Sequence, residues 1–136
     1  MRVRLLDTNA VIALTAQRSD ALLRQVEASE PGSLVVSAVV AHELYYGAYR
    51  SQKVAFNLET LRLLFSDLAI LDLDREDARV AGEIRADLAR SGSPIGPYDV
   101  LIAGQAKARN LTLVTNNMGE FARVVGLRVE DWSRAL

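Results

Sequence analysis

Short runs of apolar residues alternate along this chain with longer stretches in which apolar and polar positions recur at helical spacing. The short runs predict strands at residues 3–6, 34–37, 70–73 and 111–115, with a last short strand at 127–129. The longer stretches predict helices at residues 10–16, 19–28, 38–49, 52–64, 75–91 and 98–109. Thr8 or Asn9 is expected to cap the first helix, because both side chains accept hydrogen bonds from free backbone amides.

This alternation of strands and helices predicts an α/β fold with a parallel sheet covered by helices on both faces. The strand segments are almost continuously apolar, which is typical of strands buried on both sides. Residues 91–97 are rich in Gly, Ser and Pro and form a loop between two helices rather than a domain boundary. Ligands in such folds bind at the carboxyl ends of the strands, so the residues that follow each strand are the candidates for a ligand site.

Composition narrows the kinds of chemistry that are open to the chain. The length of 136 residues fits one domain, and 50% hydrophobic with 24% charged residues is a globular balance that excludes disorder as the main description. The absence of cysteine excludes disulfides and thiolate chemistry, and the single His42 makes a histidine zinc site improbable. A net charge of −1 argues against a basic nucleic-acid coat but leaves a local basic patch open. No apolar run reaches the roughly 20 residues of a membrane helix, so we expect a cytoplasmic protein without membrane contact.

Acidic residues stand out at several of these positions, each with two interpretations. Asp7 directly follows the first strand, where it is either a helix cap or a ligand for a metal ion or a water. Glu43 lies on an apolar helix face, where it is either paired with an arginine, exposed, or bound to a cation. Asp99 lies in the first turn of a helix, where it either complements the helix dipole or serves a site.

The segment after the fourth strand carries further polar groups. Thr115 and Asn117 are suited to hydrogen bonds with a ligand, a water or a neighbouring carboxylate, although both are also ordinary turn residues. Glu120 follows three residues later, as a capping partner or as a fourth acid.

The acids together predict a divalent-cation site. Carboxylates that an α/β sheet gathers at one edge repel one another, and a divalent cation neutralises that repulsion. Oxygen ligands without cysteine favour Mg²⁺ or Mn²⁺ over zinc. Carboxylate-held Mg²⁺ is widely used to cut phosphodiesters, because the metal lowers the pKa of a bound water and stabilises charge on the phosphate.

Four motifs follow one another along the chain: LLDTN at residues 5–9, SAVVAHELYYG at 37–47, IGPYDVLIA at 95–103 and LVTNNMGEF at 113–121. This ordered set resembles the PIN-domain proteins, and specifically the VapC-type toxins of type II toxin–antitoxin systems. The resemblance covers essentially the whole chain and implies one PIN domain over residues 1–136. It implies a PIN-like three-layer α/β/α sandwich with a central parallel sheet of about five strands. It further implies an endoribonuclease in which Asp7, Glu43 and Asp99 bind Mg²⁺ or Mn²⁺ and cleave RNA, with transfer RNA among the family's targets.

The resemblance also implies supporting residues. Many relatives carry Asp at the position of Asn117, so a second tightly held metal ion is in question here. Thr8, Asn9, Thr115 and Asn117 are then candidates for contacts to the ligands or to water.

The same resemblance implies protein partners. These toxins pair with a small antitoxin and usually form homodimers. The expected antitoxin surface comprises Leu44, Tyr45, Tyr46, Tyr49 and Phe56, which alternatively only pack two helices together. The alternative function is a non-catalytic α/β protein-interaction domain, in which the acids serve as caps and ion-pair partners.

Overall fold

The computed structural model describes residues 2–16 and 19–133; the predicted domain of residues 1–136 also includes residues 1, 17–18 and 134–136, which lie outside this description. The strands within the described residues are β1 (Arg4–Leu6), β2 (Leu34–Ser37), β3 (Ala69–Leu71), β4 (Thr112–Val114) and β5 (Val129–Glu130). The helices there are α1 (Thr8–Thr15), α2 (Asp20–Ala28), α3 (Ala38–Tyr49), α4 (Val54–Asp67), α5 (Arg75–Arg90), α6 (Pro97–Ala108) and α7 (Met118–Phe121).

The strands form one sheet in the order β3-β2-β1-β4-β5, and every pair is parallel. The central strand β1 pairs through Leu5 with Val35 on one side and with Leu113 on the other. All three side chains are buried, as expected for strands with helices on both faces. The predicted parallel sheet of about five strands is therefore confirmed.

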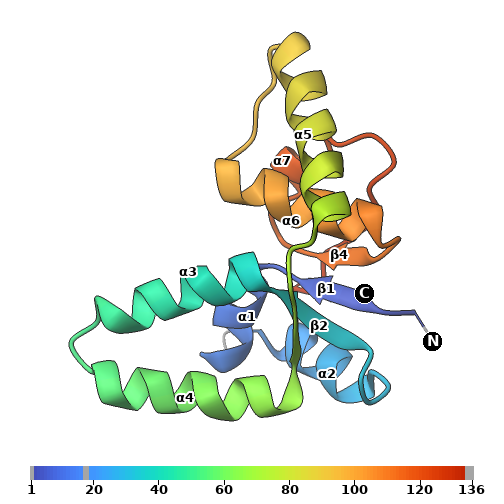
Figure 1. Cartoon of the computed structure of the whole chain (residues 1–136). Coiled ribbons are helices and arrows are strands. Elements are labelled where there is room, and N and C mark those ends of the chain that lie inside the picture. Colours follow the sequence, from blue (N-terminus) through green and yellow to red (C-terminus); the bar gives the residue numbers. More distant parts are fainter. Residues whose placement is uncertain (1, 17–18, 134–136) are drawn as a thin grey trace.

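Helices cover the sheet on two sides. In Figure 1, α5, α6 and α7 gather above the sheet, whereas α1, α2 and α4 lie below it. The antiparallel pair of α3 and α4 extends away from the sheet as one arm, and α5 rises on the other side. This arrangement matches the expected PIN-like three-layer α/β/α sandwich.

Helices α5 and α6 approach each other closely at one point. A Cβ atom added to Gly104 of α6 would lie 2.5 Å from the Cβ atom of Ala81 on α5, and 2.7 Å from its backbone. Only a residue without a side chain fits there, so Gly104 sets the separation of the two helices. Asp99 lies in the first turn of α6, and Arg109 follows its last residue. The contact therefore helps to fix the positions of both residues relative to α5.

Several predicted boundaries are wrong. The cap of α1 is Asp7, not Thr8 or Asn9, and its side chain accepts a hydrogen bond from the amide of Ala10. The strand predicted at 70–73 is β3 at Ala69–Leu71, an edge strand with two exposed residues rather than a buried one. The short helix α7 was not expected, because four residues are too few to display a helical period.

The remaining differences are shifts of a few residues. Helix α4 runs from Val54 to Asp67 instead of 52–64, and β5 comprises Val129 and Glu130 instead of 127–129. None of the helices in the described part of the chain is long and apolar enough to cross a membrane.

Candidate functional site

The predicted site residues gather where the strand order reverses. From β1 the sheet continues through β2 to β3 on one side and through β4 to β5 on the other. Asp7 follows β1 and Thr115 follows β4, and the Asp7 amide donates a hydrogen bond of 3.0 Å to the carbonyl oxygen of Val114. The crevice at such a switch point is the usual ligand site of an open α/β sheet.

Asp7 is a buried carboxylate that serves as the cap of α1. Its Oδ1 accepts a hydrogen bond of 2.8 Å from the Ala10 amide, so its orientation is fixed by the start of the helix. Burial raises the pKa of Asp7, and the negative charges of Glu43 and Asp131 add to the rise. Hydrogen bonds from Thr115 and from Ala10 offset part of it. The interpretation of Asp7 as a cap is confirmed. The same carboxylate is also close enough to other acids to be affected by their negative charge.

Glu43 faces the same crevice from the second turn of α3. The hydroxyl of Thr8 donates a hydrogen bond of 2.9 Å to its Oε1, which joins the start of α1 to α3. Glu43 is half-buried, and none of the ion pairs in the described part of the chain involves it. Among the described residues, Glu43 therefore has no arginine partner, and its side chain is only partly exposed.

Asp99 lies in the first turn of α6 and shares a hydrogen bond with Glu120 of α7. Partial burial, this hydrogen bond and the charges of Glu120, Glu43 and Asp7 together raise the pKa of Asp99 to about 7. The pKa of Glu120 is lowered, chiefly because its carboxylate accepts the hydrogen bond from Asp99. Below about pH 7 the Asp99–Glu120 pair therefore holds one proton between its two carboxyl groups.

The loop before α6 closes around this pair. The Gly96 backbone hydrogen bonds to the Glu120 carboxylate, and a Cβ atom at Gly96 would lie 3.3 Å from Oδ2 of Asp99. Arg123 holds the same loop, because its Nη1 donates a hydrogen bond of 2.9 Å to the carbonyl of Pro94. Its charge also helps to lower the pKa of Glu120.

The predicted supporting residues fall into two groups. Thr8 donates a hydrogen bond to Glu43, and Thr115 hydrogen bonds to Asp7 through its side chain. The hydroxyl oxygen of Thr115 also accepts a 2.9 Å hydrogen bond from the backbone amide of Asn117. Asn117 donates through Nδ2 to Oε2 of Glu120 at 3.0 Å. Asn9 is exposed, and its side chain forms no hydrogen bond with any described residue. Three of the four residues thus orient a carboxylate, and Asn9 does not.

The acids fit a hard divalent cation by their chemistry, although they are not preassembled around one. Among the described residues, no group of three or more acidic or histidine side chains is arranged to hold a metal ion as it stands. The site offers only oxygen ligands, and each neighbouring acid raises the pKa of Asp99. A cation at this position has to displace the proton that Asp99 shares with Glu120.

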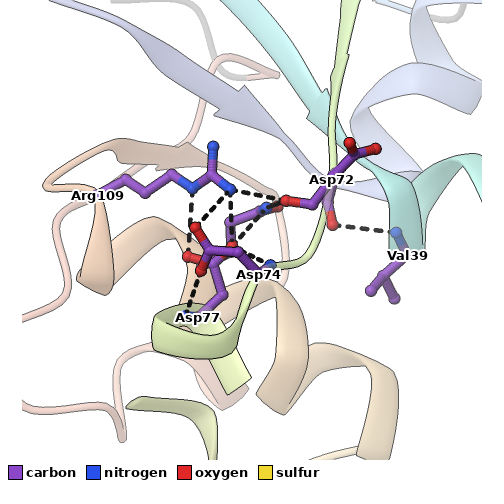
Figure 2. A network of polar contacts seen from close by, with 7 residues as sticks. Val39, Asp72, Asp74, Asp77 and Arg109 are labelled. Atoms are coloured by element: carbon purple, nitrogen blue, oxygen red, sulfur yellow. Dashed lines mark hydrogen bonds and ion pairs between the residues drawn. The ribbon is translucent and has the colours of Figure 1, made fainter. Parts of the chain in front are cut away.

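A second cluster of carboxylates, at the other end of α6, behaves in the opposite way. Asp77 is only 1% exposed, and Arg109 donates to it through Nε at 3.2 Å and through Nη2 at 2.9 Å (Figure 2). Gln105 and the Asp74 amide also donate to Asp77. Burial works to raise the pKa of Asp77, but these hydrogen bonds outweigh it and leave the pKa below its ordinary value. Arg109 and Gln105 also donate to the carbonyl oxygen of Asp72, at 2.7 and 3.0 Å, so this network anchors α5 and α6 to the end of β3.

A groove lies between α1, α3 and α4, beside Glu43. It has a volume of about 440 Å³ and is lined by Ile12, Thr15, Glu43, Leu44, Gly47, Ala48, Asn57, Thr60 and Leu61. Helices α3 and α4 also carry exposed aromatic side chains, namely Tyr45, Tyr46, Tyr49 and Phe56. Leu44 is buried and forms part of the groove wall rather than of the exposed surface. Tyr45 packs against Phe65 of α4 with ring centroids 5.7 Å apart, so it also joins the two helices.

Sequence reasoning missed two contributors to the crevice. Asp131 follows β5 and raises the pKa of Asp7, and its place after a strand was a signal that went unused. Gly96 had no signal beyond its place in a Gly- and Pro-rich loop. Glu120 was left between two roles; it is an acid of the crevice, since α7 has no side-chain cap.

Comparison with known proteins gives consistent matches. Residues 4–127 match the PIN domain family. A tRNA(fMet)-specific endonuclease VapC of Shigella flexneri is 45% identical over 129 residues, which are 95% of this chain and 97% of that protein. The protein of the same name from Salmonella typhimurium is 41% identical over 128 residues, 94% and 96% of the two chains. The crystal structure of DNA-bound VapBC from Salmonella typhimurium superposes with a TM-score of 0.91 at 39% identity, covering 97% of this chain and 99% of that one.

Proposed function

Because this chain belongs to the PIN-domain family, and within it to the VapC ribonucleases, we propose that it is the toxin of a toxin–antitoxin pair. It is an endoribonuclease that hydrolyses phosphodiester bonds of RNA, and a small cognate antitoxin of the VapB type neutralises it. One PIN domain over residues 1–136 carries this activity. The observation that supports the activity most is the meeting of Asp7, Glu43, Asp99 and Glu120 at the switch point of the sheet.

Asp7, Glu43 and Asp99 are the residues that hold a Mg²⁺ or Mn²⁺ ion, with Glu120 beside them. When bound, such an ion lowers the pKa of a water and stabilises negative charge on the phosphate. The chain's own groups orient the ligands: the Ala10 amide and Thr115 fix Asp7, and Thr8 fixes Glu43. Asp99 would hold the cation as an ionised carboxylate, so metal affinity should rise as the pH increases through about 7.

The antitoxin covers the exposed aromatic side chains of α3 and α4. Tyr46, Tyr49 and Phe56 are each more than half exposed, and such large apolar surfaces mark protein-interaction sites. Glu43 is one of the residues that line the groove between α1, α3 and α4, so a segment bound there would contact a crevice acid and could block the crevice. Replacing Tyr49 or Phe56 with Ala should weaken the antitoxin complex about tenfold or more while the toxin remains folded.

Two finer points complete the proposal. The substrate to test first is initiator transfer RNA, because the relatives from Shigella flexneri and Salmonella typhimurium are tRNA(fMet)-specific endonucleases. The toxin forms a homodimer, which sedimentation of the antitoxin-free protein measures directly.

The test is cleavage of initiator transfer RNA and of total RNA by the antitoxin-free protein, with Mg²⁺, with Mn²⁺ and with EDTA. We expect discrete fragments with 5′-phosphate and 3′-hydroxyl ends that vanish with EDTA and on adding the antitoxin. Asp7→Asn should abolish cleavage, whereas the matched variant Asp87→Asn, an exposed acid of α5 paired with Arg90, should cleave normally. Cleavage that survives EDTA, or an active Asp7→Asn protein, contradicts the mechanism. Folded wild-type protein that cleaves neither RNA favours the non-catalytic interaction domain.

A further inference from the structure

Two aromatic rings meet beside the acidic crevice, and the proposed chemistry does not use them. His42 of α3 and Tyr98 of α6 contact each other in an edge-to-face arrangement, with ring centroids 5.7 Å apart and planes inclined by 65°. Each ring belongs to the residue directly before one of the crevice acids, Glu43 and Asp99 respectively. The pair therefore bridges the two helices that carry these acids.

The two rings remain open to solvent despite their contact. His42 is exposed, and Tyr98 is 46% exposed, so the pair is not a core contact between helices. In the described part of the chain neither ring forms a side-chain hydrogen bond. An exposed pair of rings in a fixed mutual geometry leaves flat aromatic surface free for a ligand.

We infer that His42 and Tyr98 form a stacking platform for an unpaired nucleobase next to the scissile phosphate. This inference rests on the proposed ribonuclease function, because it takes the RNA backbone to cross the acids. Bases in single-stranded or looped RNA are splayed out and stack on aromatic side chains. Such stacking suits this crevice, because the acids repel the phosphates of the RNA backbone. An aromatic ring can hold a base there without any favourable charge interaction.

The platform adjoins the proposed antitoxin surface on α3 and differs from it by its contact to α6. Tyr46 and Tyr49 follow His42 along α3 by four and seven residues, and the guanidinium of Arg50 lies 5.5 Å from the centre of the Tyr46 ring. Tyr45 packs against Phe65 of α4. Only His42 joins α3 to the helix that carries Asp99 by a ring contact among the described residues.

The test measures RNA binding in the cleavage-deficient Asp7→Asn background, so that the RNA survives. The probes are initiator transfer RNA and a set of its copies, each of which lacks the base at one position of a loop. With intact rings, removal of the stacked base should weaken binding by about five- to 150-fold. With Tyr98→Leu or His42→Leu, binding of the intact RNA should fall to a similar level, and removal of that base should cost nothing further.

Matched variants separate stacking from folding. Tyr98→Phe and His42→Phe keep a ring and should bind the intact RNA within about twofold of the parent. Val125→Ala removes an exposed apolar side chain from the segment after α7 and should change nothing. Melting temperatures of all variants show whether any loss arises from unfolding, and His42→Leu keeps the test valid if Tyr98→Leu is unstable.

The outcomes distinguish the inference from the function it rests on. RNA binding that is unaffected by both leucine variants, or base removal that costs the same with and without the rings, overturns the platform alone. Leucine variants that lose only antitoxin affinity assign the rings to the antitoxin interface and overturn it as well. RNA that neither binds nor is cleaved by folded wild-type protein overturns the proposed function, and the platform with it.

Discussion

A cluster of carboxylates lies beside each end of helix α6, and the pKa values of Asp77 and Asp99 shift in opposite directions at the two ends. At its C-terminal end, Arg109 and Gln105 donate to Asp77, and the pKa of that buried acid lies below its ordinary value. At its N-terminal end, Asp99 meets Glu120, Glu43 and Asp7, and its pKa rises to about 7. The first cluster has a cation built in, whereas the second gathers negative charge.

This difference separates structure from function in a way that the residue types alone do not. A carboxylate that is satisfied by its own chain stabilises the fold and has little left to offer a ligand. Carboxylates that raise one another's pKa are held together by the rest of the fold at a cost in stability, and a bound cation removes that cost. The acidic crevice is therefore the place for chemistry, and the network around Arg109 supports it.

Breaking the Arg109 network should have the largest effect on stability. Arg109→Met leaves Asp77 buried without its cation and should lower the free energy of unfolding by about 2–4 kcal/mol, less than for a fully buried pair because Arg109 is 30% exposed. Urea denaturation at pH 8 measures this. The matched variant Arg79→Met breaks only the exposed pair with Glu76 and should change stability by less than about 0.5 kcal/mol. Equal effects of the two substitutions would contradict the contrast.

Disturbing the contact between α5 and α6 should affect both clusters at once. Gly104→Ala places a methyl group 2.5 Å from the Cβ atom of Ala81, so the helices must separate, at a cost of about 1–3 kcal/mol. Cleavage should fall as well, because α6 carries Asp99. Gly82→Ala on α5 meets nothing within 4 Å and should gain up to about 1 kcal/mol from helix propensity. A Gly104→Ala protein as stable and active as the wild type would refute the fixed spacing.

Removing the charge of Asp99 should stabilise the protein while abolishing its activity. The raised pKa means that the fold binds a proton more tightly than the unfolded chain, so this group's contribution to stability falls as the pH rises from about 4 to about 7. Asp99→Asn should therefore gain about 1–2 kcal/mol at pH 8 in metal-free buffer, discounted for its partial exposure, and little at pH 4.

Thermal melts of Asp99→Asn and the wild type across this pH range check the sign. Adding Mg²⁺ or Mn²⁺ at pH 8 should raise the melting temperature of the wild type and leave that of Asp99→Asn nearly unchanged. A variant that is destabilised at pH 8 would mean that Asp99 is satisfied in the fold like Asp77.

Adding a carboxylate beside Glu120 should have a smaller effect on stability, and the sign of that effect should depend on the metal ion. Asn117→Asp replaces a side chain that donates to Glu120 by one that repels it, and should cost about 1 kcal/mol at pH 8 without metal. With Mn²⁺ the sign should reverse, because a further carboxylate strengthens the cation site. Isothermal titration of Mn²⁺ into both proteins measures the affinity, and weaker binding by Asn117→Asp would count against a cation beside Glu120.

The sequence predicted the sheet well because its strands are unambiguous. Four apolar runs bounded by turn residues located β1, β2, β3 and β4 to within a few residues, and their spacing by helices implied parallel pairing. The predicted cap of α1 was wrong because Asp7, Thr8 and Asn9 all have side chains that suit a helix N-cap. What decides among them is the hydrogen bond from the Asp7 amide to Val114, a contact with a distant strand.

The partnerships of the carboxylates were harder to predict, since they depend on topology rather than on local pattern. Asp77 and Arg109 are separated by 32 positions and meet only because α5 and α6 pack side by side. Nothing in the local sequence distinguishes Asp77, which pairs with Arg109, from Asp99, which has no cationic partner among the residues that the structure describes. The sequence identified Asp99 through its motif and its place at a helix start, and left Glu120 between two roles.

The most direct test of the contrast is a carboxyl-carbon NMR titration of Asp99 and Asp77 in the same sample, without and with Mg²⁺. We predict that Asp99 titrates near pH 7 without metal and at a clearly lower pH with it, whereas the pKa of Asp77 lies below that of an ordinary aspartate in both cases. If Asp99 titrates near pH 4 without metal, or if Mg²⁺ shifts neither group, the crevice does not hold the uncompensated charge on which the proposed function depends.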